Sequence, residues 1–143
     1  MKALSIKQPW ASLIAHGIKD IENRTWKTNF RGRIYIHASA KKAGELPYIL
    51  SDTQGDFVYY NESDGLKSHS EITSAIIGEV DIIDCVINHA SIWAEQTHSR
   101  AFADKQFYFD KPIYNWVLAN AVLYDEPILN VKGKLSLWEF EKK

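Results

Sequence analysis

The chain has 143 residues, 45% of them hydrophobic and 13% aromatic, which fits one folded domain with its own core and excludes a disordered chain. The formal charge is only −1, but residues 1–42 hold nine Lys and Arg against two Asp and Glu, or +7, and the remaining 101 residues carry −8. The single cysteine excludes an internal disulfide and no apolar run is long enough to cross a membrane, so we expect a cytoplasmic protein without a membrane partner.

Hydrophobic periodicity predicts a series of strands and short helices. In chain order they are a strand over residues 3–6, a helix over 9–16, an extended segment over 20–26, a strand over 33–38, a strand over 75–88, a weak helix over 91–105, a strand over 116–124 and a closing strand over 135–140. Gly17 suits the C-terminal cap of the first helix, Gly78 suits a bulge, and Pro127 and Gly133 bracket a turn. Five or six strands with short helices predict an α+β chain built on a small curled or barrel-like sheet.

Residues 44–74 interrupt this pattern. They are rich in Asp, Ser, Gly, Asn and Glu, and the apolar residues 57–60 stand alone among them. We expect a surface excursion with one short element here. Neither a linker nor a repeat divides the sequence, so we expect residues 1–143 to form a single domain.

Residues 3–42 carry most of the functional signal, because Lys and Arg alternate there with aromatic residues. Cationic side chains bind phosphates and aromatic rings stack on bases, so this segment predicts nucleic-acid binding. The alternative is an ordinary solvated surface. The residues predicted to bind nucleic acid are Lys7, Gln8, Trp10, Arg24, Arg31, Arg33, His37, Ser39, Lys41 and Lys42.

Lys19, Glu22 and Arg24 place three charges within a few residues of the first helix. One interpretation is a structural ion pair, which contributes only about 0–1 kcal/mol where it is exposed. The other is catalytic: a lysine whose pKa is lowered by neighbouring arginines acts as a base or nucleophile, beside Glu22. The sequence alone leaves both readings open.

Known cofactor motifs do not appear in the sequence. The five histidines are scattered and none stands four residues from another on a helix, so we predict no metal site. Walker, G-x-G-x-x-G and G-x-S-x-G patterns are also missing, and we predict no cofactor.

Several motifs, in this order, resemble the ASCH domain family. Gly17, Lys19, Glu22 and Arg24 match its G-x-K-x-x-E-x-R pattern, and residues 31–33 match its Arg-Gly-Arg turn. The segments IIGEVDIIDCV, NWVLANAVLYDEPI and KGKLSLWEF look like its later strands. The resemblance covers nearly the whole chain except residues 44–74.

The resemblance implies a PUA-like fold, a small β-barrel with flanking helices, and a cleft to which Lys19, Glu22 and Arg24 contribute. It implies that the ligand is single-stranded or modified RNA or a nucleoside, with DNA as a further candidate ligand. It also implies an enzyme alternative, because some small relatives hydrolyse acetylated cytidine with a lysine and a threonine three residues later, and others are linked to ribonuclease activity. Here Glu22 stands in place of that threonine. A third reading is a protein-interaction adaptor in transcription or translation regulation that uses residues 44–74 and the acidic remainder of the chain.

Overall fold

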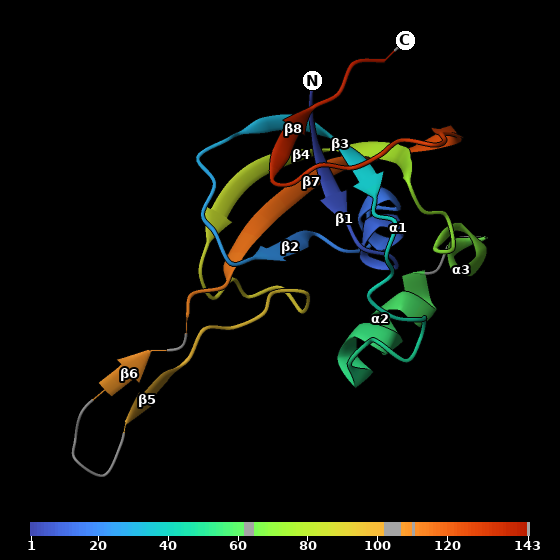
Figure 1. Ribbon diagram of the computed structural model, residues 1–143. Coiled ribbons are helices and arrows are strands. Elements are labelled where there is room, and N and C mark those ends of the chain that lie inside the picture. Colours follow the sequence, from blue (N-terminus) through green and yellow to red (C-terminus); the bar gives the residue numbers. More distant parts are fainter. Residues whose placement is uncertain (62–64, 102–106, 110, 143) are drawn as a thin grey trace.

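The computed structural model describes residues 1–61, 65–101, 107–109 and 111–142. Its elements are β1 (Lys2–Ile6), α1 (Trp10–Ala15), β2 (Ile21–Arg24), β3 (Gly32–Ala38), α2 (Asp52–Asn61), α3 (Leu66–His69), β4 (Ala75–Val86), β5 (Ser99–Ala101), β6 (Phe107–Phe109), β7 (Tyr114–Ile128) and β8 (Leu137–Glu139). Figure 1 shows long strands curling across the molecule with the helices to one side. The α+β architecture and the predicted strands around residues 3–6, 33–38, 75–88, 116–124 and 135–140 are confirmed.

One six-stranded sheet organises the chain. Its order is β2-β7-β4-β3-β1-β8, while β5 and β6 pair with each other separately. Only β1 and β3 run parallel, and the other neighbours in the sheet are antiparallel. The sheet curls into a half-barrel, as the sequence predicts. The predicted bulge at Gly78 is confirmed, because the β4–β7 register shifts there and a Cβ on this residue would lie 2.3 Å from the Val122 carbonyl oxygen.

The core lies between the sheet and α1. Ile34, Ile36 and Ala38 share one face of β3, which packs with β4 against the helix face that carries Ala11, Ile14 and Ala15. The opposite face is also buried, in a cluster with Trp138. Trp116 on β7 is fully buried in the same cluster. A second cluster joins the other face of α1, through Leu13, to α2, α3 and Trp93. The helix α1 is therefore packed on two sides, which fixes the position of the chain that follows it.

Residues 44–74 contain two helices rather than one short element. Leu46, Val58 and Leu66 are buried, so the segment supplies one wall of the second cluster. Its apolar residues are spread over three short pieces of chain, and this spacing hides their common face in the sequence.

One other local prediction is wrong. No helix forms between residues 91 and 101, where the chain makes turns and then β5; residues 102–106 of that prediction lie outside the described residues. The predicted turn between Pro127 and Gly133 does form: β7 runs through Pro127 to Ile128, and the chain then bends at Asn130, whose φ is +58°. Among the described helices, none is both long enough and apolar enough to cross a membrane.

Candidate functional site

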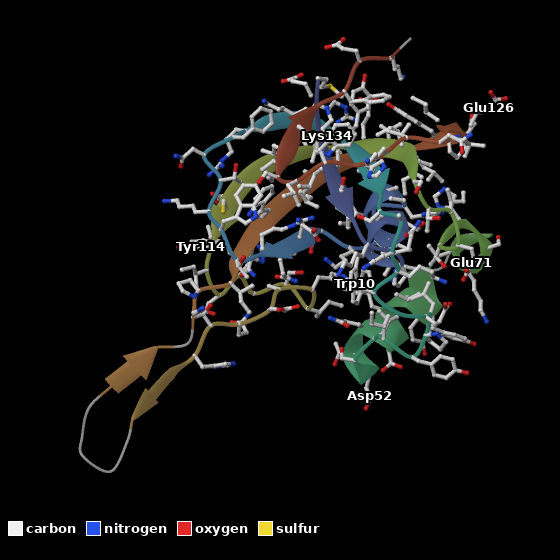
Figure 2. The ribbon with its side chains drawn as sticks, viewed as in Figure 1. Trp10, Asp52, Glu71, Tyr114, Glu126 and Lys134 are labelled. Carbon is white, nitrogen blue, oxygen red and sulfur yellow. The ribbon has the colours of Figure 1, made fainter. Side chains whose placement is uncertain are left out.

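A pocket of about 510 Å³ opens beside α1 and β2, within the size range of small-molecule sites. Trp10 lies near α2 and Lys134 lies near β8, so the pocket extends between these two parts of the molecule (Figure 2). The lining residues are Ser5, Ile6, Lys7, Trp10, Lys19, Glu22, Asn23, Arg24, Thr25, Trp26, Ser39, Ala43, Gln54, Trp93, Glu95, Lys134, Leu135 and Ser136.

The turn after α1 places Lys19 in the pocket wall. Gly17 has a φ of +74°, a left-handed value that glycine adopts at little cost and that ends the helix. The Leu13 carbonyl then accepts hydrogen bonds from the backbone N–H groups of Ile18 at 3.0 Å and Lys19 at 3.1 Å. These bonds satisfy the Leu13 carbonyl at the end of the helix and turn the chain into β2. Lys19 and Glu22, three residues apart, therefore both line the pocket.

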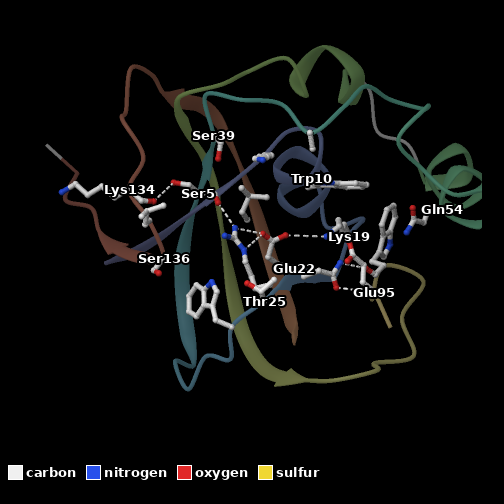
Figure 3. Close-up of a pocket in the computed structure, with 18 residues that line it drawn as sticks. Ser5, Trp10, Lys19, Glu22, Thr25, Ser39, Gln54, Glu95, Lys134 and Ser136 are labelled. Carbon is white, nitrogen blue, oxygen red and sulfur yellow. Dashed lines mark hydrogen bonds and ion pairs between the residues drawn. The ribbon is translucent and has the colours of Figure 1, made fainter. Parts of the chain in front are cut away.

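Lys19, Glu22 and Arg24 form one charge cluster in the pocket wall, in which Lys19 and Glu22 are buried and Arg24 is partly exposed; Figure 3 shows Lys19 and Glu22 there. Lys19 Nζ lies 3.8 Å from Glu22 Oε1, while Arg24 approaches Glu22 Oε2 through Nη2 at 2.7 Å and Nε at 2.9 Å. The side chains of Lys19 and Glu22 are only 4% and 8% exposed. The pair is therefore not the solvent-exposed ion pair that contributes little to stability.

Burial also changes the acid–base behaviour of Lys19. Loss of water around the ammonium group lowers the Lys19 pKa, and Arg24 lowers it further, although Glu22, Glu95 and Asp20 act in the opposite direction. The ammonium also donates to the Ile21 carbonyl and lies 5.3 Å from the centre of the Trp10 ring. A lysine in this setting gives up its proton more readily than a surface lysine does.

The two ends of the pocket differ in character. In Figure 3, Lys134 and Ser136 lie at one side, and Trp10, Gln54 and Glu95 lie toward the other, with Glu22 between them. The rings of Trp10 and Trp93 stand nearly perpendicular, with centroids 6.4 Å apart. The pocket thus joins an end with an exposed cation to an end with flat aromatic surface.

Several residues predicted to bind nucleic acid line this pocket, and others lie elsewhere. Lys7, Trp10, Arg24 and Ser39 line it together with Lys19 and Glu22. Lys41 lines a neighbouring groove with Ser39 and His37. Gln8 is fully buried, where its side chain accepts from the Ser12 N–H and donates to the Ile72 carbonyl, both at 2.9 Å.

Three cations of the basic segment are held by carboxylates from later in the chain. Arg33 bonds to Glu79 at 2.8 Å and to Asp81 at 2.9 Å on the neighbouring strand β4. Arg31 lies 3.7 Å from Asp84. Lys42 donates to Glu45 and to Glu71. None of the three lines the pocket.

His37 is buried and has two partners. Its Nε2 lies 2.7 Å from the Val131 carbonyl oxygen, which only accepts, so Nε2 carries the proton and Nδ1 accepts from the Ser5 hydroxyl at 2.9 Å. Burial lowers the His37 pKa, although the bond to Val131 raises it in part. The ring therefore ties β1 and β3 to the loop before β8.

Sequence reasoning missed the part of the pocket that comes from distant segments. Gln54, Trp93, Glu95 and residues 134–136 reach it from α2, from the irregular chain after β4 and from the loop before β8. The sequence offers one signal for these segments, an isolated tryptophan in an irregular polar stretch. In the structure this residue, Trp93, is 3% exposed. Among the described residues, no three His, Cys, Asp or Glu side chains come together in a way that would hold a metal ion.

Comparisons with known proteins agree with this architecture. Residues 4–128 match the family profile of the ASCH domain. The chain is 30% identical over 142 residues to human activating signal cointegrator 1, covering 98% of this chain and 22% of that protein, and 37% identical over 83 residues to the mouse protein of the same name, covering 58% and 14%. It thus spans about a fifth or less of these relatives. The chain belongs to the ASCH domain family and has its PUA-like fold.

Proposed function

We propose that this ASCH domain binds RNA by holding one nucleotide in the pocket around Lys19, Glu22 and Arg24. The observation that carries the proposal is the division of the pocket into a cationic end and an aromatic end. A nucleotide has the same division, because its phosphate is anionic and its base is flat and apolar on both faces. Membership of the ASCH family supports an RNA-related role.

The aromatic end suits a base. Trp10 is half-buried and offers indole surface, with the buried Trp93 packed nearly perpendicular against it, and stacking on an aromatic side chain is worth about 1–3 kcal/mol per base. Glu95 is exposed and lies at this end, where its carboxylate can accept a hydrogen bond from an exocyclic amino group. We therefore expect the three bases with an exocyclic amino group, cytosine, adenine and guanine, to bind more tightly than uracil.

The cationic end suits the phosphate. Lys7 and Lys134 are exposed at the pocket rim, and Ser39 and Ser136 add hydroxyl donors. Arg24 is partly exposed, and it holds its position through Glu22 and through the Ser5 carbonyl at 2.7 Å. Cations and hydroxyls of this kind are the usual partners of phosphate oxygens.

The test is titration of the protein with the four nucleoside 5′-monophosphates. Binding is monitored by tryptophan fluorescence and by calorimetry. Trp10→Ala should weaken binding by about 5- to 100-fold, the loss of one stacking contact. Lys67→Ala should leave binding unchanged, because Lys67 is exposed on α3 and does not line the pocket. Circular dichroism and urea unfolding establish that each variant is folded. Equal affinity of wild type and folded Trp10→Ala, or no binding by wild type, would contradict the proposal.

A second candidate is hydrolysis of a modified nucleoside, favoured by the lowered pKa of Lys19 beside Glu22. The neutral amine would take a proton from water as the oxygen attacks the acyl carbon of N4-acetylcytidine. The C–N bond then breaks, the proton passes to the leaving nitrogen, and the products are acetate and cytidine. Chromatography of the products tests this, and Lys19→Met should abolish turnover while Lys67→Ala retains it. Equal turnover by Lys19→Met would exclude Lys19 as the base.

A further inference from the structure

We infer that a second groove next to the pocket holds the phosphates of neighbouring nucleotides, so that the ligand is a single-stranded RNA segment and not a free nucleotide. This inference rests on the proposed function of the pocket. It assigns a role to a surface that the pocket itself does not include.

The groove is continuous with the pocket. It has a volume of about 730 Å³ and shares Ser5, Lys7, Ser39, Lys134 and Leu135 with the pocket as lining residues. Its other lining residues are His37, Ala40, Lys41, Ser74, Asn130, Val131, Lys132 and Gly133. A chain that leaves the cationic end of the pocket therefore passes directly into the groove.

The charge of the groove has one sign. Lys7, Lys41, Lys132 and Lys134 are all exposed, and none of them has an ion-pair partner among the residues that the structure describes. The lining residues named above include no Asp or Glu. Lys42, in contrast, is neutralised by Glu45 and Glu71. Four unneutralised ammonium groups along one groove fit a polymer with regularly spaced negative charges.

The loop that carries two of these lysines is held firmly. Val131 donates its backbone N–H to the Ser74 carbonyl at 2.8 Å and accepts from His37 at 2.7 Å. At Gly133 the backbone approaches β1 and β3 so closely that a Cβ would lie 2.5 Å from Ser5 Oγ and 2.7 Å from His37 Cε1. His37 is thus a positioning residue: it fixes the loop, and the loop places Lys132 and Lys134 before any ligand arrives. Such preorganisation lowers the entropic cost of binding.

The chemistry of the groove predicts how the strand is read. Lysine ammonium groups bind phosphates as point charges, so the groove adds affinity without sequence preference. Ser39, Ser74 and Asn130 add neutral hydrogen-bond donors to the same surface. Base preference then resides in the pocket, while affinity rises with the number of nucleotides that reach the groove.

The test compares cytidine 5′-monophosphate with hexacytidylate RNA over a range of salt concentrations. The variant is Lys41→Ala combined with Lys132→Ala, because neither residue lines the pocket. The matched control is Lys67→Ala combined with Lys111→Ala, which removes two exposed lysines that line neither the pocket nor the groove. Each phosphate contact contributes about 0.7 to the slope of log affinity against log salt for a single strand, or about 5-fold in affinity at 0.1 M salt.

The expected result is that the Lys41/Lys132 variant loses about 1.4 in slope and about 25-fold in hexacytidylate affinity at 0.1 M salt. Its affinity for the monophosphate stays at the wild-type value, and the control variant behaves as wild type with both ligands. Wild-type affinity of the Lys41/Lys132 variant for hexacytidylate overturns the inference, as does a wild-type protein that binds hexacytidylate no more tightly than the monophosphate. In both cases the pocket retains its proposed function. A wild-type protein that binds neither ligand overturns the proposed function and the inference together.

Discussion

Glu22→Gln should destabilise the protein strongly, whereas Lys19→Met should not. Glu22 compensates two cations, Lys19 at 3.8 Å and Arg24 at 2.7 Å, and the side chain of Lys19 is 4% exposed. Removing the shared carboxylate leaves a buried ammonium without its nearest anion, a change that costs about 3–5 kcal/mol in buried pairs. Lys19→Met removes the buried charge itself, and Glu22 keeps Arg24. We expect that variant to lie within about 1 kcal/mol of wild type.

The assay is urea unfolding at pH 7, supported by thermal unfolding. For a chain of 143 residues an unfolding entropy of about 0.3 kcal/mol/K converts a loss of 3 kcal/mol into a fall of about 10 °C in Tm. Lys19→Met should unfold within about 3 °C of wild type. Equal losses of unfolding free energy in the two variants would refute the reasoning, because the Lys19 ammonium would then itself stabilise the fold.

Other predictions concern the loop and the buried histidine. Burial lowers the His37 pKa below 6.5, so the unfolded state takes up the proton first and the free energy of unfolding falls as the pH drops below about 6.5. In urea unfolding from pH 7.5 to 5.5, the free energy of unfolding of His37→Asn should fall less than that of wild type. An equal fall in the two proteins would contradict this. Gly133→Ala should cost about 1–3 kcal/mol because its Cβ meets Ser5 and His37, while Gly55→Ala in α2, with nothing within 4 Å, should gain about 0.5–1 kcal/mol. Trp93→Ala should cost about 3–5 kcal/mol, since the ring is 3% exposed between Trp10 and Phe57. A Gly133→Ala variant as stable as wild type, a Gly55→Ala variant less stable than wild type, or a smaller loss at Trp93 would contradict the packing described at that position.

The sequence predicts the elements whose signals are local. Alternating apolar residues identify β3, a run rich in Ile and Val identifies β4, and the apolar spacing with Gly17 identifies α1. The helices of residues 44–74 and the irregular chain around Trp93 have no such period. Their apolar residues meet across the second cluster, so only the folded chain reveals their common face.

The same division holds at the candidate site. Lys19, Glu22 and Arg24 are close in sequence and stay close in space. Arg33 and Lys42 belong to the same basic, aromatic-rich segment of the sequence. In the structure, however, carboxylates of β4 neutralise Arg33, and Glu45 and Glu71 neutralise Lys42. A charge count along the sequence cannot separate these cases, because it does not contain the tertiary partner of each cation.

The order of the strands also bears on association between molecules. The long strands β4 and β7, of 12 and 15 residues, lie inside the sheet, while its two edges are β2, with four residues, and β8, with three. Charged side chains occupy both edges, with Glu22 and Arg24 on one and Glu139 on the other. Unpaired edge backbone is what lets sheets of separate molecules join and aggregate, and short charged edges oppose this. The sheet thus protects its most apolar, strand-forming sequences from neighbouring copies of itself.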